Sequence, residues 1–143
     1  MAAYFADTSF WMALSRKRDQ SNRHAVAWNQ FVIRTRSSIV TTEAVLLGVA
    51  ERPLRREHSR RCSGGLPPRP CGRRIEVVPF QPELIDSAVQ LYRTRPDKNW
   101  SLTDCLSIVV MERRHLTDAL TTDGHLEQAG LKVMLLVQPP LGV

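Results

Sequence analysis

The stretch Ser101–Gly124 reads SLTDCLSIVVMERRHLTDALTTDG and joins a helical pattern to a short strand pattern. Over residues 102–114, apolar side chains recur at the spacing of one helical face, at Leu102, Leu106, Val109 and Val110. Ser101 is a residue type that caps a helix at its start. Residues 119–122 are a short β-type run, and Asp123 follows it. The sequence therefore predicts a helix followed by a strand.

This arrangement gives two carboxylates special positions. Asp104 lies in the first turn of the predicted helix, and Asp123 lies at the exit of the predicted strand. In a parallel sheet, strand exits and helix starts share the edge at which ligands bind. Two acids at such places indicate a candidate site.

Outward from this stretch, strand and helix patterns alternate along the chain. Strands are predicted at 4–6, 38–42, 75–79, 119–122 and 132–137, and helices at 10–14, 23–36, 43–50, 82–95, 102–114 and 126–129. Such alternation is typical of a three-layer α/β/α fold with a mainly parallel sheet, here of about five strands. A length of 143 residues fits a single domain over residues 1–143.

The composition is that of an ordinary globular protein, with 43% hydrophobic and 24% charged residues. No apolar run approaches the roughly 20 residues of a membrane span, and the first residues lack the basic start of a signal peptide. Three cysteines fit free thiols in the cytoplasm. We therefore expect a cytoplasmic protein without membrane association.

The segment 51–74 differs from the rest of the chain. It contains eight arginines, two glutamates, four prolines and three glycines, and its charge accounts for the whole net charge of +6. Neither a helical nor a strand period fits it, so we expect disorder or a loose surface excursion there. Because the basic charge belongs to one segment, it is no argument for nucleic-acid binding by the domain.

Four acids share one context, namely the end of a predicted strand or the start of a helix. They are Asp7, Glu43, Asp104 and Asp123. If the strands are parallel, these carboxylates converge on one edge, where their repulsion calls for a cation. Hard oxygen ligands select Mg²⁺, with Mn²⁺ as a second choice. Such a site hydrolyses phosphodiester bonds with a metal-activated water.

Each of these residues also has a structural interpretation. An acid near a helix N-terminus complements the helix dipole, and Ser101 with Asp104 resembles a capping box. Neighbouring hydroxyls at Thr8, Ser9 and Thr103 are candidates for orienting a carboxylate or a water. His125 could contact phosphate, but a histidine in a first helical turn is more often simply exposed. The coincidence of four acids favours a site.

Four motifs in order resemble the PIN-domain proteins, specifically the VapC-type toxins of bacterial toxin–antitoxin pairs. They are FADTSFWMAL, TTEAV, WSLTDCLSIVVM and ALTTDGHLEQAG, and the resemblance covers residues 1–50 and 75–137. It implies a magnesium-dependent endoribonuclease, a homodimer, and inhibition by a cognate VapB-type antitoxin. It also implies that Asp7, Glu43, Asp104 and Asp123 are the metal and catalytic residues, with Asp7 and Asp104 as the principal metal ligands.

Residues 51–74 depart from the family, whose members usually have a helical pair there. Our hypothesis is that this segment is translated from a shifted reading frame that is restored near Arg74. Reading the coding segment in another frame should then give an amphipathic helix, and the hypothesis fails if neither frame does. A catalytically impaired PIN-fold remnant that still binds its antitoxin is therefore the alternative function.

Two other enzyme or signalling classes fit less well. A haloacid-dehalogenase-type phosphatase needs a second aspartate two residues after the first, where this chain has Ser9. A receiver domain needs paired acids after the first strand and a lysine at a strand end, and neither is evident.

Overall fold

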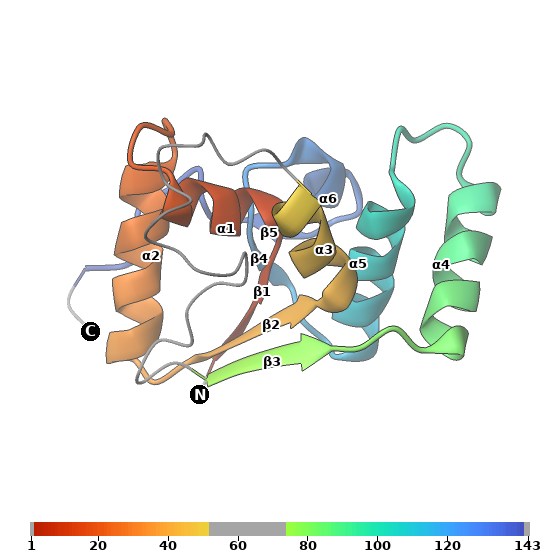
Figure 1. The fold of residues 1–143 in the computed structure, drawn as a ribbon, viewed down its shortest axis with the longest axis horizontal. Helices are drawn as coiled ribbons and strands as arrows, with labels where there is room; N and C mark the ends of the chain where they lie inside the picture. The colour runs from red at the N-terminus through yellow and green to blue at the C-terminus, as the bar shows by residue number, and fades with distance from the viewer. Residues whose placement is uncertain (1, 52–73, 142–143) are drawn as a thin grey trace.

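The computed structural model describes residues 2–51 and 74–141, and its centre is a five-stranded sheet (Figure 1). All strand pairs are parallel, and the order across the sheet is β3-β2-β1-β4-β5. The strands are β1 (Ala3–Ala6), β2 (Ser38–Thr42), β3 (Arg74–Val78), β4 (Asp118–Leu120) and β5 (Lys132–Val133). The predicted fold class, a parallel α/β sheet of about five strands, is thus confirmed.

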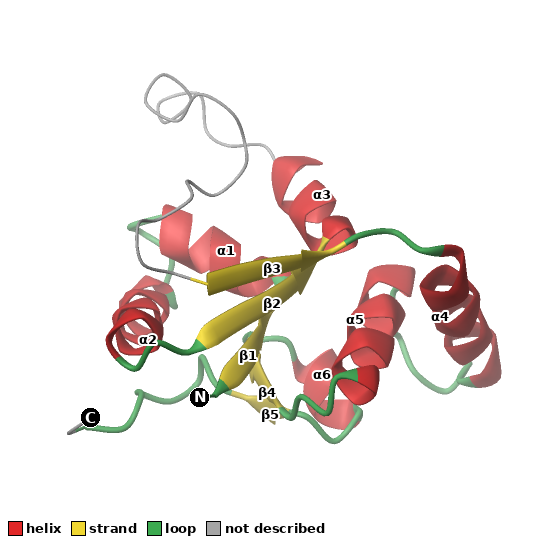
Figure 2. Cartoon of the chain, turned by 90° about the horizontal axis from the view of Figure 1, so that it is seen from below, coloured by secondary structure: helices red, strands yellow, loops and turns green. Residues whose placement is uncertain are grey.

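Helices cover the two faces of this sheet (Figure 2). They are α1 (Thr8–Ser15), α2 (Asn22–Arg34), α3 (Glu43–Glu51), α4 (Pro82–Thr94), α5 (Leu102–Arg113) and α6 (Gly124–Gln128). The first three helices lie on one face, where α1 contacts α2 and α3, and the last three lie on the other, where α5 contacts α4 and α6. This division follows from right-handed crossovers, because the chain reverses its direction across the sheet between β3 and β4.

The buried core lies along β1, the central strand. Phe5 and Ala6 are fully buried, and strands pair with β1 on both sides. A strand that is covered on both faces has apolar residues at successive positions, without the alternation of apolar and polar residues seen in half-exposed strands. Residues 4–6 could therefore be predicted as a strand from their continuous apolar run. The core continues into α2 and α5 through Trp28 and Met111, both buried.

Two predicted strands are shorter than expected. The strand predicted at 119–122 ends at Leu120, and the one predicted at 132–137 ends at Val133. The chain beyond the end of β5 contacts α2 instead of a neighbouring strand. Trp28 Nε1 of α2 donates to the Val137 carbonyl at 2.9 Å. His24 Nδ1 likewise lies 2.6 Å from the Leu135 carbonyl oxygen. These side chains bind carbonyls beyond β5, and the chain leaves the sheet.

Helix α5 begins as predicted at Ser101. Ser101 Oγ accepts the Asp104 N–H at 3.0 Å, and Ser101 N–H donates to Asp104 Oδ2 at 2.9 Å, which completes the capping box with an aspartate in the usual Glu or Gln position. Seven of the following residues are buried, so α5 runs through the interior. The cap therefore holds the Asp104 carboxylate in a defined orientation at the end of a rigid element.

Helix α3 is only partly buried. Val45 is buried, whereas Leu46 and Val49 are only partly buried against the core. The predictions for the segment between α3 and β3 lie outside the described residues. At its two ends, Glu51 belongs to α3 and Arg74 to β3. None of the helices in the described ranges has the length and apolarity that crossing a bilayer requires.

Candidate active site

The predicted acids occupy the places that the strand and helix patterns indicated. Asp7 directly follows β1 at the N-cap position of α1, and Glu43 directly follows β2 as the first residue of α3. Asp104 lies in the first turn of α5, and Asp123 is the N-cap residue of α6 beyond β4. Because β1, β2 and β4 are parallel, these positions all lie at the carboxyl-terminal edge of the sheet.

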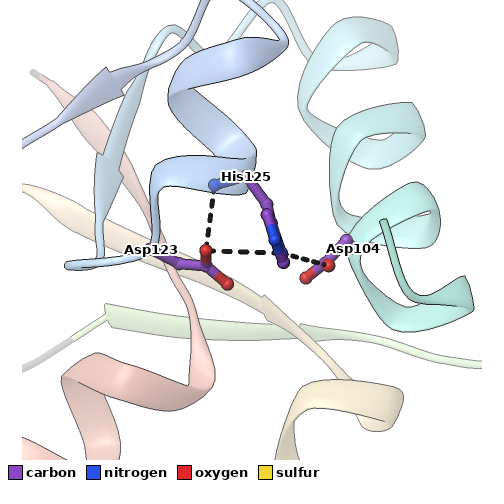
Figure 3. Close-up of side chains that lie close together, drawn as sticks. All are labelled: Asp104, Asp123 and His125. Atoms are coloured by element: carbon purple, nitrogen blue, oxygen red, sulfur yellow. Dashed lines mark hydrogen bonds and ion pairs between the residues drawn. The ribbon is translucent and has the colours of Figure 1, made fainter. Parts of the chain in front are cut away.

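Two of these acids meet around a histidine (Figure 3). His125 Nδ1 lies 3.1 Å from Asp104 Oδ2 and 3.4 Å from Asp123 Oδ1. One ligand atom from each of the three residues lies within 4.8 Å of the other two, and all three residues are partly exposed or near the surface. The capped start of α5 and the start of α6 thus present two carboxylates and an imidazole to one small volume.

His125 is held in place on several sides. Its backbone N–H donates to Asp123 Oδ1 at 2.9 Å, and its carbonyl accepts a hydrogen bond from Trp100 Nε1 at 3.1 Å. Ionised carboxylates only accept hydrogen bonds, so Nδ1 carries the proton in this geometry. Sequence reasoning favoured a merely exposed histidine. The sequence feature that could have indicated its place in the cluster is its position two residues after Asp123, which caps a short helix.

Asp7 lies next to this cluster but deeper in the protein, with 6% of its surface exposed. Its Oδ2 accepts a hydrogen bond from Thr121 Oγ1 at 3.0 Å. Burial raises the pKa of the Asp7 carboxyl, hydrogen bonds from Thr8 and Thr121 lower it in part, and the charges of Asp104 and Asp123 raise it further. The charges of Asp104 and Asp123 therefore act on the Asp7 carboxyl, which places the three residues in one neighbourhood.

Glu43 is directed differently from the other three acids. It is exposed, and its Oε2 accepts the Phe80 N–H at 2.8 Å. In the described part of the chain, the group of neighbouring ligand atoms contains Asp104, Asp123 and His125, and it includes neither Asp7 nor Glu43. The carboxylate thus fastens the loop between β3 and α4 beside the sheet edge.

The hydroxyls near Asp7 only partly follow the sequence-based interpretation. Ser9 Oγ lies 2.9 Å from Thr121 Oγ1, so it reaches the carboxylate through a second hydroxyl. Thr103 lines an apolar groove of about 340 Å³ between α3, α4 and α5. Thr121, which sequence reasoning counted only as a strand residue, is the hydroxyl that contacts Asp7.

The residues at this edge fit a divalent cation. Carboxylate oxygens of Asp104 and Asp123 converge within ligand distance of a shared point, and the buried Asp7 carboxylate lies close enough to raise their mutual repulsion. A bound cation would remove that repulsion. Oxygen ligands favour Mg²⁺ or Mn²⁺, and the protonated Nδ1 of His125 acts here as a hydrogen-bond donor to the carboxylates.

The effect of the buried Asp7 carboxylate on folding stability can be measured without a metal. We expect Asp7→Asn to raise the free energy of unfolding at neutral pH in EDTA by roughly 0.5–2 kcal/mol, the usual gain when a functional site is relaxed. The pKa of Asp7 is higher in the folded than in the unfolded chain, so the folded chain binds more protons between the two values. Stability of the native sequence therefore falls as pH rises through that window.

The measurement is urea unfolding at a series of pH values. The advantage of Asp7→Asn should shrink as pH falls toward the ordinary pKa of aspartate and should be lost below it, because Asp7 is then protonated in both the folded and the unfolded chain. The control is Asp97→Asn, since Asp97 is exposed and its pKa is lowered by a hydrogen bond from Arg95. An equal gain in the control would contradict the assignment to Asp7.

Comparisons with known proteins identify the family of this fold. The family model of the PIN domain matches residues 4–132. The structure of Mycobacterium tuberculosis VapC20, a sarcin–ricin loop cleaving toxin, is similar with a TM-score of 0.70 and 24% identity, over 95% of this chain and 99% of that chain. The structure of FitAcB from Neisseria gonorrhoeae is similar with a TM-score of 0.60 and 21% identity, over 92% of this chain and 96% of that chain.

A structure of FitAB bound to an IR36 DNA fragment is also similar, with a TM-score of 0.58 and 19% identity over 91% of this chain and 92% of that chain. A comparison with curated proteins gave no match. At such identities the similar structures establish a shared fold, while the family model covers most of the sequence. This chain therefore belongs to the PIN-domain family.

Proposed function

We propose that this protein is a VapC-like toxin, an endoribonuclease that hydrolyses RNA phosphodiester bonds and depends on Mg²⁺, with Mn²⁺ as a possible substitute. The observation that carries the proposal is the convergence of Asp104 and Asp123 beside the buried Asp7. Membership of a family that generally consists of nucleases supports it. The similar fold of a toxin described as cleaving the sarcin–ricin loop also supports it.

In this proposal Asp7 and Asp104 are the principal ligands of the ion, and Asp123 completes the site. A bound Mg²⁺ would polarise the phosphate and lower the pKa of an attacking water. The capping box orients Asp104, because Ser101 N–H donates to the same oxygen that His125 approaches. The chain's own contribution is thus to hold carboxylate oxygens in place before substrate arrives.

Glu43 is the fourth acid of the proposed site. It lies at the exit of β2, which pairs in parallel with β1. Its Oε2 accepts the Phe80 N–H and so holds the loop between β3 and α4 at this edge. We assign it a supporting role in positioning the edge of the site, with Asp7, Asp104 and Asp123 nearer to the reacting phosphate.

The proposal includes partners. A cognate VapB-type antitoxin would neutralise the enzyme, and two copies of the chain would form a homodimer in the cytoplasm, with residues 1–143 as one PIN-like domain. The groove that Thr103 lines supports a partner surface, because Leu47, Phe80 and Leu102 in it are about half exposed. Exposed apolar surface of this kind is a common mark of protein interfaces.

The direct test is RNA cleavage by the purified full-length chain. Single-stranded and structured RNAs should be cut in Mg²⁺ or Mn²⁺ and remain intact in EDTA. Expression in bacteria should arrest growth, and co-expression of the adjacent upstream reading frame should restore it. Saturable Mn²⁺ binding without RNA cleavage would instead identify the alternative, a PIN-fold remnant that is catalytically impaired.

A further inference from the structure

The hydroxyl of Thr121 lies at the meeting point of the two strand exits that carry the site. Thr121 is fully buried. Its Oγ1 lies 3.0 Å from Asp7 Oδ2, 2.9 Å from Ser9 Oγ and 3.0 Å from the backbone nitrogen of Asp123. One side chain therefore contacts one predicted metal ligand through its carboxylate and another through its backbone.

The direction of each hydrogen bond follows from the chemistry of the groups. A hydroxyl has one proton to donate and two lone pairs to accept. The Asp123 N–H can only donate, and an ionised Asp7 carboxylate can only accept, so Thr121 gives its proton to Asp7. The remaining lone pair of Thr121 then accepts the proton of Ser9, whose own oxygen accepts the Thr122 N–H at 3.1 Å.

The hydrogen-bonding capacity of Thr121 is thereby fully used. It has no lone pair left for a metal ion, and its burial keeps it from substrate. What it does is couple two backbones, since Asp7 follows β1 and Asp123 follows β4. The Asp7 carboxylate accepts a hydrogen bond from the Thr8 backbone and one from the Thr121 hydroxyl, and only the second ties it to the chain beyond β4.

We propose that Thr121 is a positioning residue, which fixes the Asp7 carboxylate and the Asp123 backbone in the mutual arrangement that binds the cation, with Ser9 as the outer support. The inference rests on the proposed metal-dependent function. The sequence offers a matched control at Thr41, which is also fully buried and donates one hydroxyl hydrogen bond, to the Ala6 carbonyl, without touching a carboxylate.

The test measures Mn²⁺ affinity of the full-length protein by calorimetry in the absence of RNA. Thr121→Val keeps the shape of the side chain but loses the hydroxyl, and it should bind Mn²⁺ about 10- to 100-fold more weakly, as is typical when a partner of a metal ligand is removed. Thr121→Ser should restore affinity close to that of the native sequence. Thr41→Val should lose thermal stability comparably while keeping native affinity.

Each result bears on a separate claim. Equal Mn²⁺ affinity in Thr121→Val and the native sequence would overturn the positioning role and leave the nuclease proposal standing. Absence of Mn²⁺ binding by the native sequence would overturn both. If Thr121→Val does not fold, Ser9→Ala decides the matter, because loss of the outer support should weaken Mn²⁺ binding, and unchanged affinity would overturn the role.

Discussion

Replacing Asp104 by asparagine is expected to lower RNA cleavage in Mg²⁺ at least about 100-fold, the upper end of the loss seen when an outer partner of a metal site is removed. The substitution removes one of the two carboxylates that converge within ligand distance at the sheet edge. It should leave the fold intact, because an amide oxygen can still accept the Ser101 N–H that completes the cap of α5. The measurement is the initial rate of RNA cleavage over a range of Mg²⁺ concentrations.

The matched control is Asp118→Asn. Asp118 is the first residue of β4 and therefore lies at the opposite edge of the sheet from the proposed site. Its Oδ1 accepts a hydrogen bond from Thr117 Oγ1 at 3.1 Å and takes no part in the acidic cluster. Cleavage by Asp118→Asn should match that of the native sequence. Full activity in Asp104→Asn would refute the site assignment.

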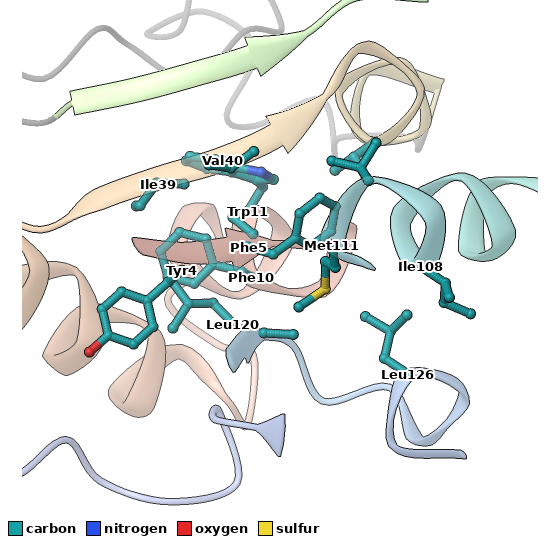
Figure 4. Packing of buried hydrophobic residues seen from close by; sticks show 14 of the residues in the cluster. Tyr4, Phe5, Phe10, Trp11, Ile39, Val40, Ile108, Met111, Leu120 and Leu126 are labelled. Carbon is teal, nitrogen blue, oxygen red and sulfur yellow. The ribbon is translucent and has the colours of Figure 1, made fainter. Parts of the chain in front are cut away.

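The largest loss of stability is expected for Phe5→Ala. Phe5 lies in the central strand, is fully buried, and packs in the interior shown in Figure 4. Removing a buried phenyl ring leaves a cavity and typically lowers the free energy of unfolding by about 3–5 kcal/mol. That is a large part of the roughly 5–15 kcal/mol that stabilises a domain of this kind. Urea denaturation followed by circular dichroism measures it.

Phe80→Ala is the matched control, because it makes the same chemical change at a residue that is 47% exposed. The loss of stability in Phe80→Ala should be smaller, since about half of the Phe80 surface stays in water in the folded protein. Comparable losses in the two variants would show that β1 is not the centre of the core.

Much of the architecture was predictable because its causes are local. The cap of α5 involves Ser101 and Asp104, three residues apart, and the structure shows it complete. The apolar run of β1 and the glycine that follows α6, Gly130 with a φ of 86°, are equally local signals. The position of an acid after a strand is also local, so the placement of all four acids on one sheet edge followed once the strands were parallel.

The partners of the side chains at that edge were not predictable in the same way. Ser9 and Thr121 are 112 residues apart in the chain, and Thr121 and Asp7 are 114 apart. Their hydrogen bonds depend on the register between β1 and β4, which no local pattern encodes. The same holds for Trp28 and the Val137 carbonyl, whose hydrogen bond marks where the chain leaves the sheet after β5.

By itself, the sequence determined the order of strands and helices and the placement of Asp7, Glu43, Asp104 and Asp123 where parallel strands end, because propensity, capping and apolar periodicity act over a few residues. Only the tertiary structure decided which carboxylates face one another. It joined His125 to Asp104 and Asp123, directed Glu43 toward Phe80, and buried Thr121 against Asp7. The reason is geometric, since side-chain contacts within a few ångströms require the paired strands and the packed helices to bring distant residues together.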